Sequence, residues 1–275
     1  MNLKKTIQRF NTKEFTDPYG IGSNFFGKIS VFNEVTNSGE ASRRRILETL
    51  PEVTVPASKV INGNGENFIL GYPNKDEWRG SILRYKYPVL PVGNTSKISS
   101  ISQIITAAIP TTLYYGHPSF TREVSLELQD SDKINSFSFF FPSNTSITTG
   151  NVIIHGSANY YKVRDVPYVD NAGFLVADVI LLDSPVQTLT FKSEGNYDPV
   201  TDTIAVATTQ SITCFVEEAY LAYTHTSERY QKIEPGDKVI TIKPSVTPKA
   251  GDNIGDYDIL SIDANETAFT CHCRK

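Results

Sequence analysis

The sequence predicts a mainly β protein built from small antiparallel barrels or sandwiches, with one or few short helices. Short apolar or alternating runs recur along the chain, and clusters of Gly, Pro, Asn and Asp separate them. In one run, Val124, Leu126 and Leu128 alternate with polar residues, which places all three on one face of a strand. In addition, one strand–turn–strand unit occurs more than once.

The recurring unit spans residues 150–166 and returns in residues 236–262. The first copy reads GNVII, HGSAN, YYKVRDV and then NAGFLVADV, and the second reads GDKVITI, a longer loop, YDILSI and then NETAFTCHC. Residues 58–85 are a weaker third candidate, for which chance similarity between short hairpins is the alternative. Three strands bury little apolar surface alone, so each unit is expected to belong to a barrel or sandwich completed by its flanks.

One helix is predicted near residues 96–109. Thr95 or Ser96 caps its start and Pro110 ends it. Its apolar stripe follows the helical spacing of three and four residues and consists of Ile98, Ile101, Ile105 and Ala108.

Three regions are expected along the 275 residues. Residues 1–115 form a β-rich region that contains the helix, and residues 116–230 form a central sandwich or barrel. Residues 231–275 form a barrel-like unit, which packs with the central domain or stands alone.

Composition excludes several classes of protein. The hydrophobic fraction of 39% and the charged fraction of 20% are those of a folded globular chain. The net charge of −4 provides no general attraction for nucleic acid. The sequence contains no run of about 18 apolar residues, so it predicts no membrane span. The N-terminus lacks the apolar centre of a signal peptide. Synthesis and assembly in the cytoplasm are therefore expected, with the three cysteines reduced.

Catalytic and metal-binding motifs are not found in the sequence. It contains no Gly-rich phosphate loop, no His-Glu-x-x-His helix and no Gly-x-Ser-x-Gly elbow. Cys271, His272 and Cys273 are zinc-ligand types, but strand alternation turns His272 away from both cysteines. We therefore expect no enzyme activity, no cofactor and no metal. A barrel hydrolase that uses Asp or Glu is the alternative, although no convergent carboxylate pair follows from the spacing.

The only basic cluster consists of Arg43, Arg44 and Arg45. Guanidinium groups bind phosphates and acidic partners, so these three are candidates for contact with DNA or another protein. In a strand, Arg43 and Arg45 share one face. The alternative is a solvated strand edge that charge keeps soluble.

Aromatic side chains form a second candidate surface, because tyrosine and tryptophan supply large contact areas at low entropic cost. The alternatives are core packing and stacking on sugars. The candidate residues are Trp78, Tyr114, Tyr115, Tyr160 and Tyr161.

The segment FFGKISVFNEVTNSGEASRRRILETLPEVTVPASKVI and the two barrel-like units resemble virion structural proteins of tailed bacteriophages, especially neck or head–tail connector proteins. The units follow a Gly-Asp-x-Val-x-Ile … Tyr-x-Val/Ile rhythm, in which Val163 and Ile259 hold the final position. The resemblance implies a ring of identical subunits in the virion around a DNA channel. It also implies partners such as portal or tail components, non-specific proximity to DNA, and no membrane. Alternatives are another β-rich virion part (baseplate, fibre base or decoration protein) or a carbohydrate-binding module.

Overall fold

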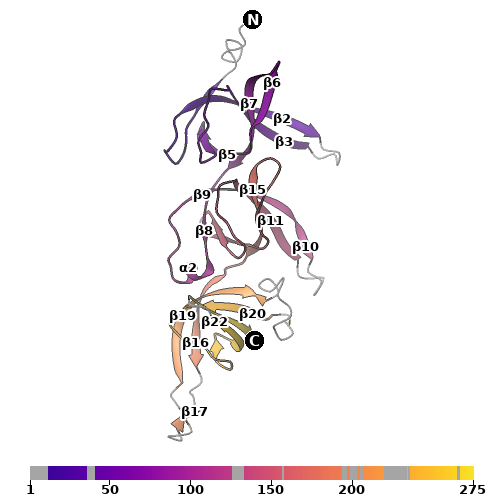
Figure 1. Cartoon of the computed structure of the whole chain (residues 1–275). Coiled ribbons are helices and arrows are strands. Elements are labelled where there is room, and N and C mark those ends of the chain that lie inside the picture. Colours follow the sequence, from indigo (N-terminus) through magenta and orange to yellow (C-terminus); the bar gives the residue numbers. More distant parts are fainter. Residues whose placement is uncertain are drawn as a thin grey trace. The chain divides into compact units, whose positions relative to one another are not determined.

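The computed structural model confirms the predicted fold class, because the chain is mainly β with curled and barrel-like antiparallel sheets (Figure 1). The chain forms two compact units, one of residues 1–97, 112–149 and 153–181 and the other of residues 98–111, 150–152 and 182–275. The structure describes residues 12–35, 41–125, 133–156, 158–193, 197–198, 203–204, 207–219, 234, 236–264 and 267–275.

The first sheet follows the order β1-β2-β3-β7-β5-β4, and β6 pairs with β7 beside this path. Backbone hydrogen bonds of 3.0 and 2.8 Å join Thr16 to Asn62, so the sheet curls until its two ends meet. Its core includes Phe15, Leu47, Phe68 and Val89. The strands are β1 (Lys13–Phe15), β2 (Phe25–Val35), β3 (Ala41–Thr49), β4 (Val60–Gly63), β5 (Glu66–Leu70), β6 (Asn74–Trp78) and β7 (Ser81–Val92).

The second sheet follows the order β10-β11-β15-β13-β12-β8-β9, and β14 pairs with β15 beside this path. Its strands are β8 (Thr95–Ser99), β9 (Tyr114–Tyr115), β10 (His117–Ser125), β11 (Lys133–Pro142), β12 (Val152–His155), β13 (Asn159–Val163), β14 (Tyr168–Val169) and β15 (Phe174–Leu182).

A closed barrel follows in the order β16-β19-β20-β23-β22-β21, with β21 paired back to β16. Its core is apolar and contains all three cysteines. The barrel uses strands from both sides of residue 230. The strands are β16 (Val186–Ser193), β19 (Thr208–Glu218), β20 (Lys238–Ile242), β21 (Asn253–Ile254), β22 (Tyr257–Ala264) and β23 (Phe269–Arg274), with β17 (Tyr197–Asp198) pairing β18 (Thr203–Ile204) separately.

The helix prediction is wrong in its extent. The helix α2 (Ile101–Ile105) has five residues, and Ile98 lies in β8 instead. Ser100 caps the N-terminus of α2. Its hydroxyl accepts a hydrogen bond from the backbone N–H of Gln103 at 3.2 Å, and its own backbone N–H donates to the Gln103 side chain at 2.9 Å. Strand pairing of β8 with β9 and β12 overrides the helical spacing of the sequence.

The first two sheets share one pairing plan. The order β2-β3-β7-β5-β4, with β6 on β7, matches β10-β11-β15-β13-β12, with β14 on β15. Each of the five strands on the second path begins 92 or 93 residues after its counterpart, as Phe25 and His117 do. The core agrees as well, because the buried residues Leu47, Phe68 and Val89 correspond to the buried residues Phe139, Tyr161 and Val179. We therefore treat the two sheets as copies of one module.

The C-terminal barrel follows the full order of the first sheet, with β16, β19, β20, β23, β22 and β21 in the places of β1, β2, β3, β7, β5 and β4. The loop before its second hairpin also repeats. The Lys59 N–H donates to Pro56 O at 3.0 Å and the Leu70 N–H to Lys59 O at 2.8 Å. In the barrel, Asp252 repeats both roles, with bonds of 3.1 Å to Lys249 and 2.8 Å from Ile259.

The structure therefore changes part of the correspondence between the copies of the repeated unit that the sequence predicts. The weaker candidate, residues 58–85, has the pairing order of residues 150–182. The predicted match of GDKVITI with GNVII is wrong, because β12 pairs with β13 whereas β20 pairs with β19 and β23. The counterpart of β12 is β21.

The two sheets of the first unit pack on each other through an apolar cluster that includes Ile69, Val92 and Phe174. Beside it, the Tyr72 N–H donates to Ala172 O at 2.7 Å, and the Tyr72 ring lies against Gly173. A Cβ on Gly173 would stand 2.5 Å from the Tyr72 nitrogen. The contact therefore requires glycine at this position.

Gly173→Ala tests this packing. Gly173 has φ +86°, so alanine adds backbone strain of about 1–2 kcal/mol and, in addition, a clash with Tyr72 of about 1–3 kcal/mol. Gly65→Ala is the matched control, because its φ is +80° and nothing lies within 4 Å of the added Cβ. Urea unfolding followed by circular dichroism should show the larger loss for Gly173→Ala. Equal losses would contradict the packing role.

Candidate interaction surface

The arginine cluster lies on β3, where the strand leaves the first hairpin. The side chains of Arg43 and Arg44 lie outside the described residues. Arg45 is engaged within its own sheet, because its guanidinium lies 3.2 Å from the Glu66 carboxylate and 5.7 Å from the centre of the Phe68 ring. β3 pairs with β2 and β7 at Arg45, so the alternative of a strand edge is wrong there.

The first hairpin of each copy extends past the rest of its sheet. Residues 41–44 of β3 pair with β2 alone, because the pairing of β3 with β7 begins at Arg45. In the same way, residues 133–135 of β11 pair only with β10. We call these two extensions the hairpin arms.

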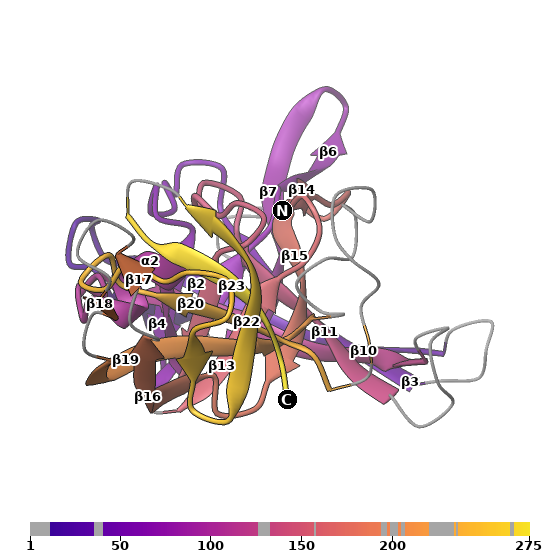
Figure 2. The same ribbon diagram turned by 90° about the horizontal axis from the view of Figure 1, so that it is seen from below.

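A third projection carries the only tryptophan of the chain (Figure 2). It consists of β6 and residues 81–86 of β7, and we call it the Trp78 hairpin. Arg79 and Gly80 have φ values of +49° and +76°, as a tight two-residue turn between Trp78 and Ser81 requires. Trp78 is 49% exposed, and the Arg79 guanidinium lies 5.2 Å from the centre of its ring.

An ionic network fixes the base of the Trp78 hairpin. Arg84 Nε donates to Asp76 at 2.7 Å and its NH1 donates to Glu48 at 3.0 Å, while the Lys86 ammonium lies 3.2 Å from Asp76. Hydrogen bonds from Arg84 and then Lys86 lower the pKa of Asp76. The hairpin therefore stands on a base held by several directional contacts.

The tyrosines predicted for an interface have different environments. Tyr114 and Tyr115 are half-buried, and Tyr115 meets the Tyr19 ring edge-on at 5.2 Å. Burial and the neighbouring Tyr115 raise the pKa of Tyr19 to about 12. Tyr160 is half-buried. Tyr161 is a core residue, and the centre of its ring lies 4.9 Å from the centre of the Phe139 ring. Tyr161 is therefore removed from the candidate surface.

Sequence reasoning missed one apolar edge. Val166, Tyr168 and Val169 are 79%, 54% and 42% exposed, and the last two form β14. β14 pairs with β15 on one side only among the described residues. The sequence signal was the apolar run after Asp165, which resembles an ordinary strand interior.

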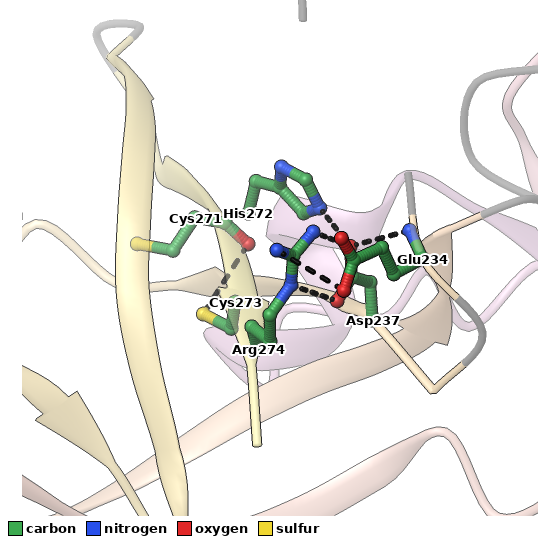
Figure 3. A network of polar contacts seen from close by, with 6 residues as sticks. All are labelled: Glu234, Asp237, Cys271, His272, Cys273 and Arg274. Carbon is green, nitrogen blue, oxygen red and sulfur yellow. Dashed lines mark hydrogen bonds and ion pairs between the residues drawn. The ribbon is translucent and has the colours of Figure 1, made fainter. Parts of the chain in front are cut away.

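A buried polar network ties the last strand to the loop before β20 (Figure 3). Asp237 is 1% exposed and accepts hydrogen bonds of 2.8 Å from the Arg274 Nε and NH2 groups. His272 Nε2 lies 3.1 Å from the same carboxylate, and the Glu234 N–H donates to it at 2.9 Å. Burial alone would raise the pKa of Asp237, but Arg274 and these partners lower it to about 2.

The cysteines lie on the opposite side of β23 from His272, as strand alternation predicts. Cys271 and Cys273 pack with Cys214 in the barrel core (Figure 3). Burial raises the pKa of Cys214 to about 11 and that of Cys271 to about 12, and it also raises the pKa of Cys273. These thiols are therefore packing residues and poor nucleophiles at neutral pH.

Within the described part of the chain, no three His, Cys, Asp or Glu side chains gather in a way that suits a metal ion. No helix in that part has the length and apolar character needed to cross a membrane. Comparison of the chain with protein-family models, with curated proteins and with solved structures found no match.

Asp237→Asn tests the polar network. The folded-state pKa is about 2 against 3.8 for the free side chain, so ionisation contributes about 2 kcal/mol above pH 4 and this contribution is lost between about pH 4 and pH 2. Urea unfolding at pH 7 should show a loss of about 2–3 kcal/mol that shrinks near pH 2. Glu234→Gln is the control, because its carboxylate is 50% exposed. A loss that does not change with pH would contradict the assignment.

Thiol reactivity tests the burial of the cysteines. The native protein should react negligibly with a disulfide reagent at pH 8, and all three thiols should react in urea. Thr213→Cys, at an exposed position, supplies a positive control on the same barrel. One thiol that reacts rapidly in the native wild-type protein would contradict the packing role.

Proposed function

We propose that the chain is a non-enzymatic structural protein that assembles into a ring in the neck, the head–tail connector or the adjoining tail of a tailed-phage virion. The observation that carries the assembly role is the repeated module. Two copies of one small β module each extend the equivalent hairpin beyond the sheet. The sequence resemblance supplies the phage neck as the setting.

Extended hairpins are suited to assembly because their outer edges retain free backbone donors and acceptors. A strand from a neighbouring subunit completes such an edge with main-chain hydrogen bonds, while alternate side chains select the partner. A chain that needed only to remain monomeric and soluble would gain nothing from several such projections. The proposal therefore assigns the hairpin arms to contacts between subunits of the ring and with other virion proteins.

The charge balance is compatible with a channel for DNA. A net charge of −4 avoids the counterion-driven binding that would retard a sliding duplex. Arg45 is already paired with Glu66, so it is a weak candidate for phosphate contact. Proximity to DNA would thus be non-specific.

The first test is the mass of the full chain by light scattering after size exclusion, with negative-stain imaging of the same peak. We expect one assembled species with a central hole. A compact trimer would contradict the neck position and favour a baseplate, fibre-base or decoration protein. A monomer at every concentration would contradict self-assembly, and binding to a glycan panel would then favour a carbohydrate-binding module.

A further inference from the structure

Two asparagines of the chain are followed directly by glycine, and both lie in the hairpin of β4 and β5. They are Asn62, before Gly63, and Asn64, before Gly65. The strand pairing ends at Gly63 and Glu66, so Asn64 and Gly65 alone form the turn. Their φ values of +57° and +80° are those of a type I′ turn, for which Asn-Gly is a preferred sequence.

An Asn-Gly pair is chemically reactive in water. The backbone nitrogen of the glycine attacks the Cγ atom of the asparagine, and a cyclic succinimide forms. The bond from Cγ to the side-chain nitrogen breaks, and the proton lost by the glycine nitrogen leaves with the ammonia. Water then opens the ring at either carbonyl, which gives aspartate or isoaspartate. Glycine favours the attack, because it has no side chain to block it and its backbone adopts both signs of φ.

Asn64 is accessible to this reaction in the folded protein. Both turn residues are exposed, and no described atom lies within 4 Å of a Cβ built on Gly65. Among the described residues, the Asn64 side chain has no hydrogen-bond partner. A turn outside the strand pairing also moves without breaking the hydrogen bonds of the sheet. The Gly65 nitrogen can therefore approach the Asn64 side chain while the sheet stays intact.

Asn62 has the same following residue but is held within the sheet. Its backbone N–H donates to Thr16 O at 2.8 Å and its carbonyl accepts from the Thr16 N–H at 3.0 Å, which forms the bridge that closes the first sheet. Its side-chain Nδ2 donates to Asn67 Oδ1 at 2.8 Å. Gly63 is buried, and a Cβ there would clash with the Phe15 ring. The Gly63 nitrogen therefore reaches the Asn62 side chain only when the sheet opens.

The C-terminal barrel has a different turn at the corresponding place. Its hairpin of β21 and β22 turns through Gly255 and Asp256, with Gly255 at φ +62°. This turn carries a carboxylate and no side-chain amide, so it has no ammonia to release. The module therefore folds with a turn that lacks the reactive pair.

We propose that Asn64 deamidates spontaneously in the folded protein, so that each chain acquires a new carboxylate as it ages. The isoaspartate product adds a methylene to the backbone, whereas the register of a hairpin depends on the length of its turn. The turn adjoins the closing bridge at Asn62, so isoaspartate weakens the closure of the first sheet. Aspartate leaves the turn intact, because Asp-Gly also suits type I′. The proposal does not depend on the assembly function.

The experiment follows both asparagines in one full-length wild-type protein. The protein is incubated at pH 8 and cleaved by an acid protease, and fragment ions in mass spectrometry locate the new acid at position 62 or 64. We expect conversion at Asn64 to be at least about tenfold faster than at Asn62, because reaction at Asn62 requires local opening of the sheet. Conversion at Asn64 should be slower at pH 6, because less of the Gly65 amide loses its proton.

Incubation in urea supplies the internal control. Both asparagines precede glycine, so they should convert at similar rates once the sheet is unfolded. Equal rates at Asn62 and Asn64 in the folded protein would overturn the proposal. Conversion of Asn64 in urea but not in the folded protein would overturn it as well.

The effect on sheet closure is tested with two variants of the turn. Asn64→Gly keeps a type I′ turn without an amide, and Asn64→Asp carries the product charge on an unchanged backbone. After the same incubation, wild type that contains isoaspartate should unfold at a lower urea concentration than fresh wild type, whereas aged and fresh Asn64→Gly should unfold alike. Fresh Asn64→Asp should unfold like fresh wild type. Aged wild type that unfolds like fresh protein would contradict the weakened closure.

Discussion

Closure of small antiparallel sheets is the constraint on which the rest of this structure depends. A strand in a flat sheet of few members leaves backbone groups without partners, and curling the sheet supplies them. The bridge between Thr16 and Asn62 does this in the first sheet, and pairing of β16 with β21 does it in the C-terminal barrel. Inward-facing residues such as Leu47 and Phe139 then fill the interior.

Because these sheets close, the strand edges that remain open need a separate explanation. The hairpin arms, β6 and β14 are the places where the described chain extends strands without covering them. From the Trp78 hairpin, the buried cluster around Phe68 includes Tyr85 alone among the described residues. The proposed assembly role rests on the backbone and apolar surface that these extensions expose.

The sequence predicted what depends on local pattern. Alternating apolar residues identified the strands, and the recurrence of residues 150–166 revealed a repeated β unit. Long-range pairing was not predictable in the same way. β20 resembles β12 in sequence, but its partners β19 and β23 are chosen by barrel closure. The helix was overextended because β8 finds its strand partners elsewhere in the chain.

The candidate surface was only partly accessible from sequence for the same reason. Alternation implies that Tyr160 and Tyr161 face opposite ways, but only the position of Phe139 decides that Tyr161 is the buried one. Arg45 appeared free until its partner Glu66, 21 residues away, was placed beside it. The β14 edge was missed because an apolar run has the same composition whether or not a neighbour covers it.

The spacing of about 92 residues between two modules of one plan carries a hazard during folding. Strands of one copy have the length and order to enter the other, and tandem repeats are prone to such misassembly. Core divergence opposes this exchange. Leu47 in the place of Phe139 would leave a void, and Phe139 in the place of Leu47 would overfill the first core. The mismatch in side-chain volume therefore favours pairing of each strand within its own module as the nascent chain folds.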